Sequence, residues 1–189
     1  QAELATVRFQ RGVSWLVTDI ALDSMRATAI ASECVAELAM FDPEWAQVLH
    51  YPDVPEDSVT WETSTARHWM HQYLLPVLPG RVREHLCATL LESAAYSGSV
   101  TTQDYIYLPS HADLGKFPSR WGTLDGRSGS FWLRDVGRGN GRDGRLALAG
   151  NDSYNPMVYR YGLQPMVTLD LRTFPDLVST PITRTEHQQ

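Results

Sequence analysis

Two apolar, strand-like segments in the last third of the chain enclose a region made almost wholly of turn-forming and polar residues. The first segment is Phe131–Gly137 (FWLRDVG) and the second is Arg160–Leu171 (RYGLQPMVTLDL). The region between them is crowded with Gly, Asn, Asp, Arg and Tyr. Strands that hold out adaptable polar loops and Tyr side chains are typical of a recognition surface. No nucleophile–base pair occurs in this region, so the pattern favours a binding protein over an enzyme.

Length and charge narrow the classes of partner. At 189 residues the chain fits a single domain, predicted to span residues 1–178 and to be followed by a polar tail at 179–189. The net charge of -6 and the single lysine, Lys116, argue against nucleic acid as a partner. No apolar run approaches the roughly 20 residues that span a bilayer, so no membrane insertion is expected. The chain starts at Gln1 and its first Met is Met25, which predicts a processed product or an excised fragment.

The first half of the chain predicts a hairpin and two short helices. β-Branched and aromatic residues predict paired strands over Val13–Ile20 and Arg26–Ser32, whereas Phe41–Glu56 is expected to be irregular. The next apolar residues recur at helical spacing and predict a helix capped by Thr63, Ser64 or Thr65 and ended by Pro76. These apolar residues are Ala66, Trp69, Met70, Tyr73 and Leu74. A second short helix is predicted to begin near Pro79.

The second half predicts antiparallel strands separated by Gly-rich turns. The predicted strands are Tyr105–Leu108, Phe131–Arg134, Arg145–Ala149 and Leu163–Leu171. Together with the helices of the first half, they indicate an α+β domain with long loops. Four tryptophans in the predicted elements are expected to pack in the core: Trp15, Trp61, Trp69 and Trp132.

Several side chains could carry chemistry, but none forms a complete site. His68 and His71 lack a third metal ligand at suitable spacing and are interpreted as exposed helix histidines. Cys34 and Cys87 are interpreted as two buried thiols, with a single disulfide between them as the alternative. His111 and Asp113 have no partner nucleophile and are interpreted as a loop-capping pair. Calcium needs six to eight oxygen ligands, which a few scattered aspartates do not establish, so neither a metal nor a cofactor is expected.

Five blocks of the sequence resemble, in order, a bacterial domain family of unknown function. Its I-T-W-x-V-L-D hairpin is similar to VSWLVTD at Val13–Asp19, and its V-T-W-E-T-C-T-L-R-x-W-L block is similar to VTWETSTARHWM at Val59–Met70. Its F-L-L-S strand is similar to YLPS at Tyr107–Ser110. Its W-W-L-R-S-P-G and G-V-R-P-A-L blocks are similar to FWLRDVG at Phe131–Gly137 and GLQPMV at Gly162–Val167.

The last two blocks also resemble the C-type-lectin-like variable proteins of diversity-generating retroelements. This resemblance implies a C-type-lectin-like fold with loop codons that are diversified by substitution of template adenines. Such substitution of Asn codons does not produce Lys, Glu, Gln or Trp, and all four are missing between Asp135 and Tyr161. The general preference of turns for Gly, Asn and Asp is the alternative explanation of this composition. Met157 is a residue that the mechanism would not generate from Asn.

These observations predict a non-catalytic ligand-recognition domain. The partner is expected to be a protein or glycan on a cell or phage surface, and the location is expected to be extracellular, on a cell surface or on a virion. The loops at 135–145 and 151–161 are predicted to supply the contacts, through Asp135, Arg138, Asn140, Arg142, Asp143, Asn151, Asp152, Ser153, Tyr154, Asn155, Tyr159 and Tyr161. A structural module of a phage tail or surface fibre is one alternative. An enzyme of the formylglycine-generating type is the other, although Cys34 and Cys87 belong to none of the matching blocks.

Overall fold

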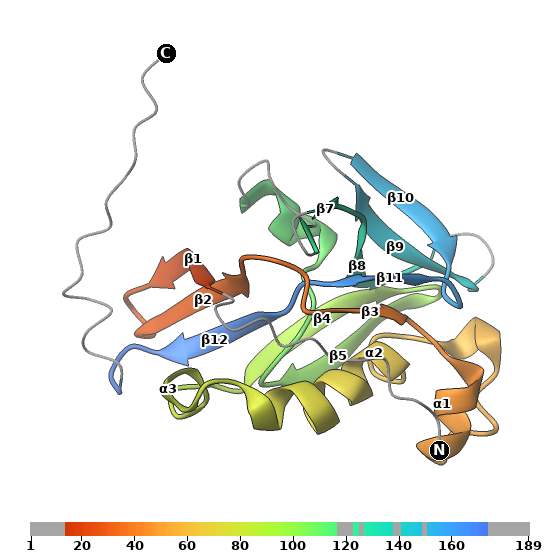
Figure 1. Cartoon of the computed structure of the whole chain (residues 1–189), viewed down its shortest axis with the longest axis horizontal. Coiled ribbons are helices and arrows are strands. Elements are labelled where there is room, and N and C mark those ends of the chain that lie inside the picture. The colour runs from red at the N-terminus through yellow and green to blue at the C-terminus, as the bar shows by residue number, and fades with distance from the viewer. Residues whose placement is uncertain (1–13, 117–122, 125–126, 138–140, 149–150, 174–189) are drawn as a thin grey trace.

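The computed structural model of the chain describes residues 14–116, 123–124, 127–137, 141–148 and 151–173 (Figure 1). The fold is mixed α+β and is built mostly of antiparallel strands with a few short helices. This agrees with the α+β class predicted from the sequence. In Figure 1 the helical run that starts at α2 lies below the β4–β5 hairpin, and the β9–β10 hairpin lies above it.

The elements are short, and most of them are strands. The strands are β1 (Trp15–Ala21), β2 (Arg26–Ala31), β3 (Ala36–Ala39), β4 (Thr89–Ala95), β5 (Gly98–Asp104), β6 (Thr123–Leu124), β7 (Arg127–Ser128), β8 (Phe131–Val136), β9 (Asp143–Leu148), β10 (Asn151–Pro156), β11 (Arg160–Leu163) and β12 (Met166–Asp170). The helices are α1 (Pro43–Val48), α2 (Thr65–Trp69) and α3 (Gly80–Arg83). Short 3₁₀ segments lie at η1 (Glu56–Ser58), η3 (Leu75–Val77) and η4 (His111–Lys116), and a π-helical segment lies at η2 (Met70–Leu74).

The largest sheet has five strands in the order β10-β9-β8-β11-β3. Its neighbours pair antiparallel except for β8 and β11, which run parallel and meet at Phe131 and Gly162. The edge strand β10 therefore has β9 as its only strand partner among the described residues. This sheet combines β3, from the first quarter of the chain, with strands from the last third, so its order depends on contacts that are distant in sequence.

The smaller sheet confirms the predicted N-terminal hairpin. Strands β1 and β2 pair antiparallel, and β12 pairs with the other side of β2. The predicted strand at Leu163–Leu171 is interrupted, because its first residue ends β11 in the large sheet and β12 begins only at Met166. Gln164 and Pro165 connect β11 in the large sheet to β12 in the smaller one, and both bind Ala31. The Ala31 N–H donates to the Pro165 carbonyl at 2.9 Å, and the Ala31 carbonyl accepts from Gln164 Nε2 at 2.9 Å.

The predicted helices are present, and a further one was missed. Ser64 caps α2, since its Oγ accepts from the Arg67 N–H at 3.1 Å. The helical run then continues through η2 and η3 to Val77, so Pro76 does not end it but lies inside its last turn. The expectation of an irregular Phe41–Glu56 is wrong for α1, because the Asp42 carboxylate caps this helix at Glu44 N (2.9 Å).

The second half departs from the prediction at the β4–β5 hairpin. This hairpin pairs in register from Thr89 with Asp104 to Ala95 with Gly98. The predicted strand at Tyr105–Leu108 is wrong, because β5 has already ended and only Tyr107 makes an isolated bridge, to Met166. The segment is nevertheless buried at Ile106 and Leu108. Its apolar character therefore reflects burial of a connecting segment and not strand pairing.

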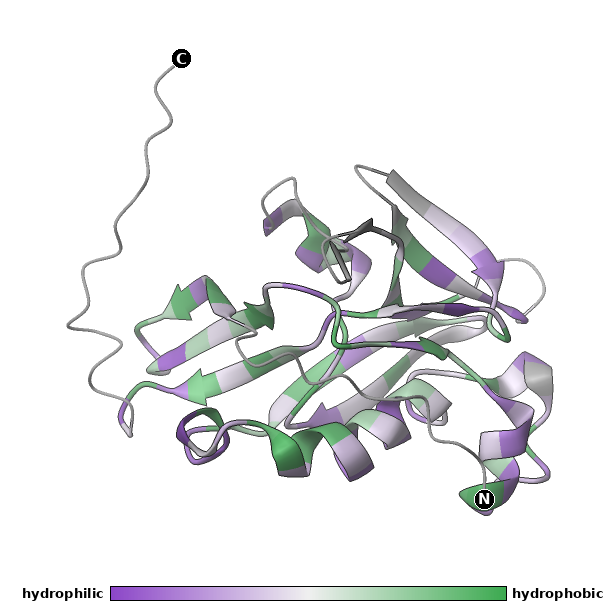
Figure 2. Ribbon diagram, viewed as in Figure 1, coloured by the Kyte–Doolittle hydropathy of each residue, from purple (hydrophilic) through white to green (hydrophobic). Residues whose placement is uncertain are grey.

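The core contains three of the four predicted tryptophans. Trp61, Trp69 and Trp132 are fully buried within one hydrophobic cluster that includes residues from Ala29 to Leu169, while Trp15 is half-buried at its margin. Figure 2 shows a contrast between two strands: apolar colours dominate β12, whereas the coloured part of β10 is pale to hydrophilic. β10 is therefore a polar edge strand of the large sheet.

Candidate functional site

The candidate site is the hairpin formed by β9 and β10 at the edge of the large sheet. The two strands pair in register from Asp143 opposite Pro156 to Leu148 opposite Asn151. Arg145 lies directly opposite Tyr154, and its guanidinium carbon is 5.5 Å from the centre of the Tyr154 ring. Such a cation–π contact orients both side chains, and it contributes about 0.5–1 kcal/mol at exposed sites. The hairpin thus presents a preformed pair of the residue types that dominate recognition surfaces.

The predicted loop at 151–161 is wrong over its first six residues, which form β10, and over its last two, which belong to β11. Asn, Asp and Pro are depleted in strands, so this segment has no strand signature of its own. Pairing with β9 satisfies one side of its backbone. Pro156 is tolerated because it ends an edge strand, where an N–H that points away from β9 needs no strand partner. The loop proper is a turn at 157–159 that leads into β11.

Asp135, predicted to contact a ligand, lies in the interior. It belongs to β8, is buried, and accepts hydrogen bonds from the backbone N–H groups of Ala94 (3.0 Å) and His111 (2.6 Å). A carboxylate that is buried and satisfied in this way joins the β4–β5 hairpin to η4. We therefore assign Asp135 a structural role and exclude it from the candidate surface.

The other predicted residues fall into three groups. Arg138 and Asn140 lie outside the described residues, and for Asn151 and Asp152 only the backbone is described. Tyr161 packs edge-to-face on the buried Trp132, with ring centres 5.1 Å apart, so it contacts the core residue on which the hairpin packs. The remaining predicted residues are half-buried or exposed along the hairpin and its turn: Arg142, Asp143, Ser153, Tyr154, Asn155 and Tyr159.

Two hollows that the sequence analysis missed lie beside the turn that follows β10. The first has a volume of about 140 Å³ and is lined by Phe41, Val59, Arg142, Pro156, Met157 and Val158. The second also has about 140 Å³ and is lined by Phe41, Pro43, Ala46, Gln47, Tyr51, Pro52 and Val54. Phe41 borders both. The first hollow combines segments that are far apart in the sequence, whereas the residues of the second all lie within Phe41–Val54. The pattern of Phe41–Glu56 carried no signal for either hollow beyond its aromatic and Pro content.

A buried ionic network lies away from the hairpin, at the start of α2. Asp104 is fully buried and accepts hydrogen bonds from Trp61 Nε1, Arg67 Nε and Thr102 Oγ1, each at 2.8 Å. Burial alone would raise the pKa of Asp104, but these hydrogen bonds outweigh it and hold the pKa below its ordinary value. The donors come from α2, from the turn before it and from β5, so the network fixes α2 against β5.

The histidines of the α2 run are not the exposed pair that the sequence predicts, because both are half-buried. The His71 ring lies between the Arg67 carbonyl, 2.9 Å from Nδ1, and Asp104, 3.5 Å from Nε2. The His68 ring packs on Tyr51 with ring centres 4.9 Å apart, and its Nε2 is buried without a hydrogen-bond partner. Burial, and then the neighbouring Arg67, lower the pKa of His68 below its ordinary value.

This arrangement predicts a loss of stability in mild acid. Because the pKa of His68 is lower in the folded than in the unfolded state, the unfolded chain takes up the proton first. The free energy of unfolding should therefore fall as the pH is lowered past 6.5, the ordinary value for histidine. His68→Phe keeps the ring on Tyr51 without the titrating group, so its stability should fall less over this range. The measurement is urea denaturation at a series of pH values from 7.5 to 5.

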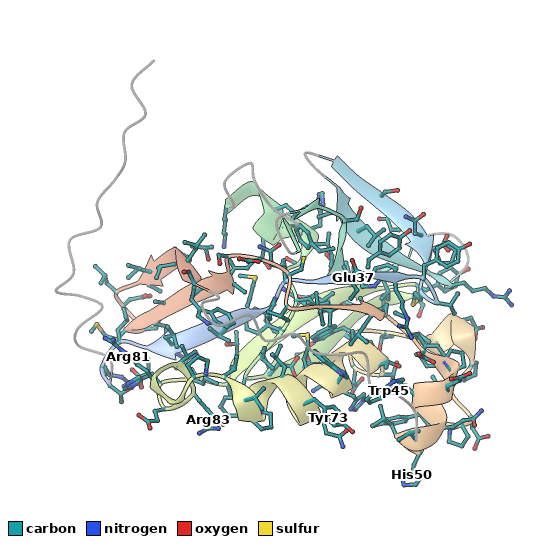
Figure 3. The ribbon with its side chains drawn as sticks, viewed as in Figure 1. Glu37, Trp45, His50, Tyr73, Arg81 and Arg83 are labelled. Atoms are coloured by element: carbon teal, nitrogen blue, oxygen red, sulfur yellow. The ribbon has the colours of Figure 1, made fainter. Side chains whose placement is uncertain are left out.

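His50→Asn is the matched control for this experiment. Figure 3 shows His50 pointing away from the body of the protein near the end of α1, and its backbone φ of 62° suits Asn. This variant should keep the pH dependence of the original chain. If His68→Phe also keeps it unchanged, His68 is not the titrating group.

No site for thiol or metal chemistry appears in the described part of the chain. No group of three or more His, Cys, Asp and Glu side chains converges there. Both cysteines are free thiols, so the disulfide alternative finds no support, and Cys34 is buried while Cys87 is half-buried. Burial, followed by repulsion from Glu37 and Glu33, raises the pKa of Cys34 to about 12. Cys34 is therefore a neutral thiol near pH 7 and a poor nucleophile.

None of the helices within the described ranges combines the length and the apolar composition that a membrane crossing requires. Comparisons of the chain with protein-family models, with curated proteins and with solved structures found no match.

Proposed function

We propose that the chain is a non-catalytic ligand-recognition domain with a C-type-lectin-like fold. In this proposal the β9–β10 hairpin and the turn at 157–159 contact a protein or glycan on a cell or phage surface. The domain then acts outside the cell, at a cell surface or on a virion. Diversification by a retroelement would change the hairpin residues between Asp135 and Tyr161, where Lys, Glu, Gln and Trp do not occur.

The observation that carries the proposal is the contrast between the polar hairpin and its rigid support. Along the edge, Arg145 stacks on Tyr154 and Tyr159 is 55% exposed. Beneath it, Trp132 is fully buried, and a Cβ at Gly144 would lie 2.6 Å from its ring. The hairpin backbone therefore rests directly on the core, while its outer side chains can vary at little cost in stability.

The test compares binding and stability in matched variants. Replacing Arg142, Asn155 and Tyr159 together with Ser removes polar and aromatic contacts from the hairpin and its turn. The control replaces Leu90, Tyr96 and Tyr105 with Ser, since these residues are 73%, 54% and 46% exposed at the other hairpin. All of these positions are exposed except Asn155, which is half-buried. Because exposed positions contribute about 0.5 kcal/mol or less each, we expect both triple variants to unfold within about 1.5 kcal/mol of the original chain.

The binding measurements are a glycan array and panning of a displayed peptide library on the immobilised full-length chain. We expect the original chain and the β4–β5 control to share their ligands, and the hairpin variant to lose them. Ligands retained by the hairpin variant would contradict the proposal. A change in oligomeric state of the hairpin variant, with no ligand for any form, would favour the structural module of a fibre instead.

A further inference from the structure

The segment 43–58, which carries α1 and is called the flap below, packs loosely on the rest of the protein. Ala46 is its only buried residue among those whose side chains are described. Within the described residues, its backbone hydrogen bonds all close between Asp42 and Ser58, as from the Tyr51 N–H to the Ala46 carbonyl at 2.7 Å. A hollow of about 140 Å³ lies beside its side chains. Such a segment can open without unfolding of the whole domain.

Two aromatic contacts hold the flap against the helical run that starts at α2. Trp45 meets Tyr73 edge-to-face, with ring centres 5.5 Å apart (Figure 3). Tyr51 meets His68 with ring centres 4.9 Å apart and ring planes inclined by 39°. The second contact differs from the first because imidazole takes up a proton close to neutral pH. One of the two contacts of the flap therefore contains a titratable group.

The surroundings of His68 oppose a positive charge on its ring. In a charged imidazole both nitrogens donate, but the buried Nε2 has no hydrogen-bond partner in the described part of the chain. Arg67 and His71 disfavour the charge, whereas Asp104 favours it but is already bound by the Arg67 guanidinium at 2.8 Å. From the flap, only the uncharged Tyr51 ring contacts His68 among the described residues. Contact with this ring contributes less than an unpaired, desolvated charge costs.

We propose that residues 43–58 form a pH-controlled flap, which separates from the α2 run when His68 takes up a proton. In the open state the imidazole is in contact with water and has its ordinary pKa of 6.5, whereas burial and Arg67 lower the pKa in the closed state. A falling pH therefore shifts the population toward the open flap. The neutral fraction of an ordinary histidine falls about tenfold from pH 7.5 to 5.5, so the ratio of open to closed flap rises by at most this factor.

The flap adjoins the surface proposed for recognition. It follows Phe41, whose N–H donates to the Met157 carbonyl at 3.1 Å. Near its other end, a Cβ at Gly141 would lie 2.9 Å from the Asp57 carbonyl oxygen, so the flap packs on the backbone just before β9. Opening of the flap would therefore uncover the base of the β9–β10 hairpin. Only this consequence rests on the proposed recognition function, because the opening itself is measured without a ligand.

Hydrogen exchange of the full-length chain, followed by mass spectrometry at pH 7.5 and 5.5, tests the opening. Exchange times are scaled for the slower chemical exchange at pH 5.5, so the remaining differences report on opening. We expect peptides from 43–58 to exchange severalfold faster in scaled time at pH 5.5. Urea at 1 M should barely change their exchange, because a local opening exposes little surface. Peptides from β4 and β5 should be better protected and should respond more strongly to urea.

His68→Phe keeps a ring on Tyr51 but cannot take up a proton. In this variant the scaled exchange of 43–58 should be the same at both pH values. His50→Asn is the control, since it removes the exposed histidine of the flap itself and should keep the severalfold acceleration. Melting curves at pH 7.5 show whether each variant is folded, and His68→Gln takes the place of His68→Phe if the latter is not.

Three results would overturn the inference. The first is scaled exchange of 43–58 that is equal at both pH values in the original chain. The second is the same acceleration in the folded His68 variant. The third is a urea response of 43–58 as strong as that of β4 and β5, because the flap would then open only with the whole domain. None of these results changes the outcome of the ligand assays, so failure of the flap and failure of the recognition function can be told apart.

Discussion

Replacing Trp132 with alanine is expected to lower the free energy of unfolding by about 3–5 kcal/mol. The side chain is completely buried, and its Nε1 donates a hydrogen bond to the Leu38 carbonyl at 2.9 Å. It also packs on Tyr161 and directly on the backbone at Gly144. Truncation therefore leaves a cavity below the β9–β10 hairpin and an unpaired carbonyl in β3. The measurement is equilibrium denaturation by guanidinium chloride, with the free energy taken by linear extrapolation.

Two further variants test whether the loss comes from the core. Leu22→Ala removes a large side chain that is 69% exposed, so its effect should stay within about 0.5 kcal/mol. Trp132→Phe keeps much of the ring volume but loses the hydrogen bond to Leu38, so it should fall between the two. A loss below about 1 kcal/mol in the free energy of unfolding of Trp132→Ala would contradict the prediction, because it would mean that Trp132 contributes little to the stability of the core.

Replacing Asp104 with alanine should destabilise the protein by a similar amount, about 3–5 kcal/mol. The change leaves the Arg67 guanidinium, which is 20% exposed, without the carboxylate 2.8 Å from its NH2 group. It also leaves the indole N–H of Trp61 and the hydroxyl of Thr102 without their acceptor. Removing one partner of a buried ion pair costs more than the pair itself contributes, because the other charge stays desolvated. Chemical denaturation at pH 7 measures this loss.

The pH dependence and a double variant separate the charge from simple loss of packing. The pKa of Asp104 is lowered in the fold, so its stabilising contribution is present above the ordinary value of 3.8 and is lost as the pH falls through the folded pKa. The original chain should therefore lose this stability in acid, whereas Asp104→Ala should not. Adding Arg67→Met to Asp104→Ala should recover part of the loss, because it removes the unpaired charge. If the double variant is no more stable than Asp104→Ala, the loss of stability does not come from the unpaired charge of Arg67.

Local signals in the sequence were sufficient for the N-terminal hairpin and for the start of the α2 run. β1 (WLVTDIA) contains Trp and the β-branched residues Val, Thr and Ile, and β2 (RATAIA) contains Thr and Ile. A tight turn joins the two strands, so the pair forms from neighbouring residues. The sequence offered Thr63, Ser64 or Thr65 as the cap of α2, and the structure shows that Ser64 caps it. Apolar residues at helical spacing predicted the burial of Trp69. For the candidate site, the sequence pattern also predicted Arg142, Tyr154 and Tyr159 as surface residues between two apolar strands.

The remaining features depended on partners that are distant in the chain. Asn151–Pro156 has the composition of a loop and becomes a strand only because β9 pairs with it. Asp135 resembles a loop aspartate, but the N–H groups of Ala94 and His111 meet it in the interior. The hollow lined by Phe41, Arg142 and Val158 forms where two segments that are distant in the sequence come together.

The sequence by itself determined the α+β class, the N-terminal hairpin, the capped helix and three buried tryptophans. Each of these follows from interactions within a few residues or from the drive to bury large apolar side chains. Only the tertiary structure decided the strand order β10-β9-β8-β11-β3, the interior place of Asp135 and the shape of the surface beside Phe41. The physical reason is that strand pairing and buried polar contacts satisfy backbone groups across long separations in the chain, and the composition of either partner alone does not specify the other.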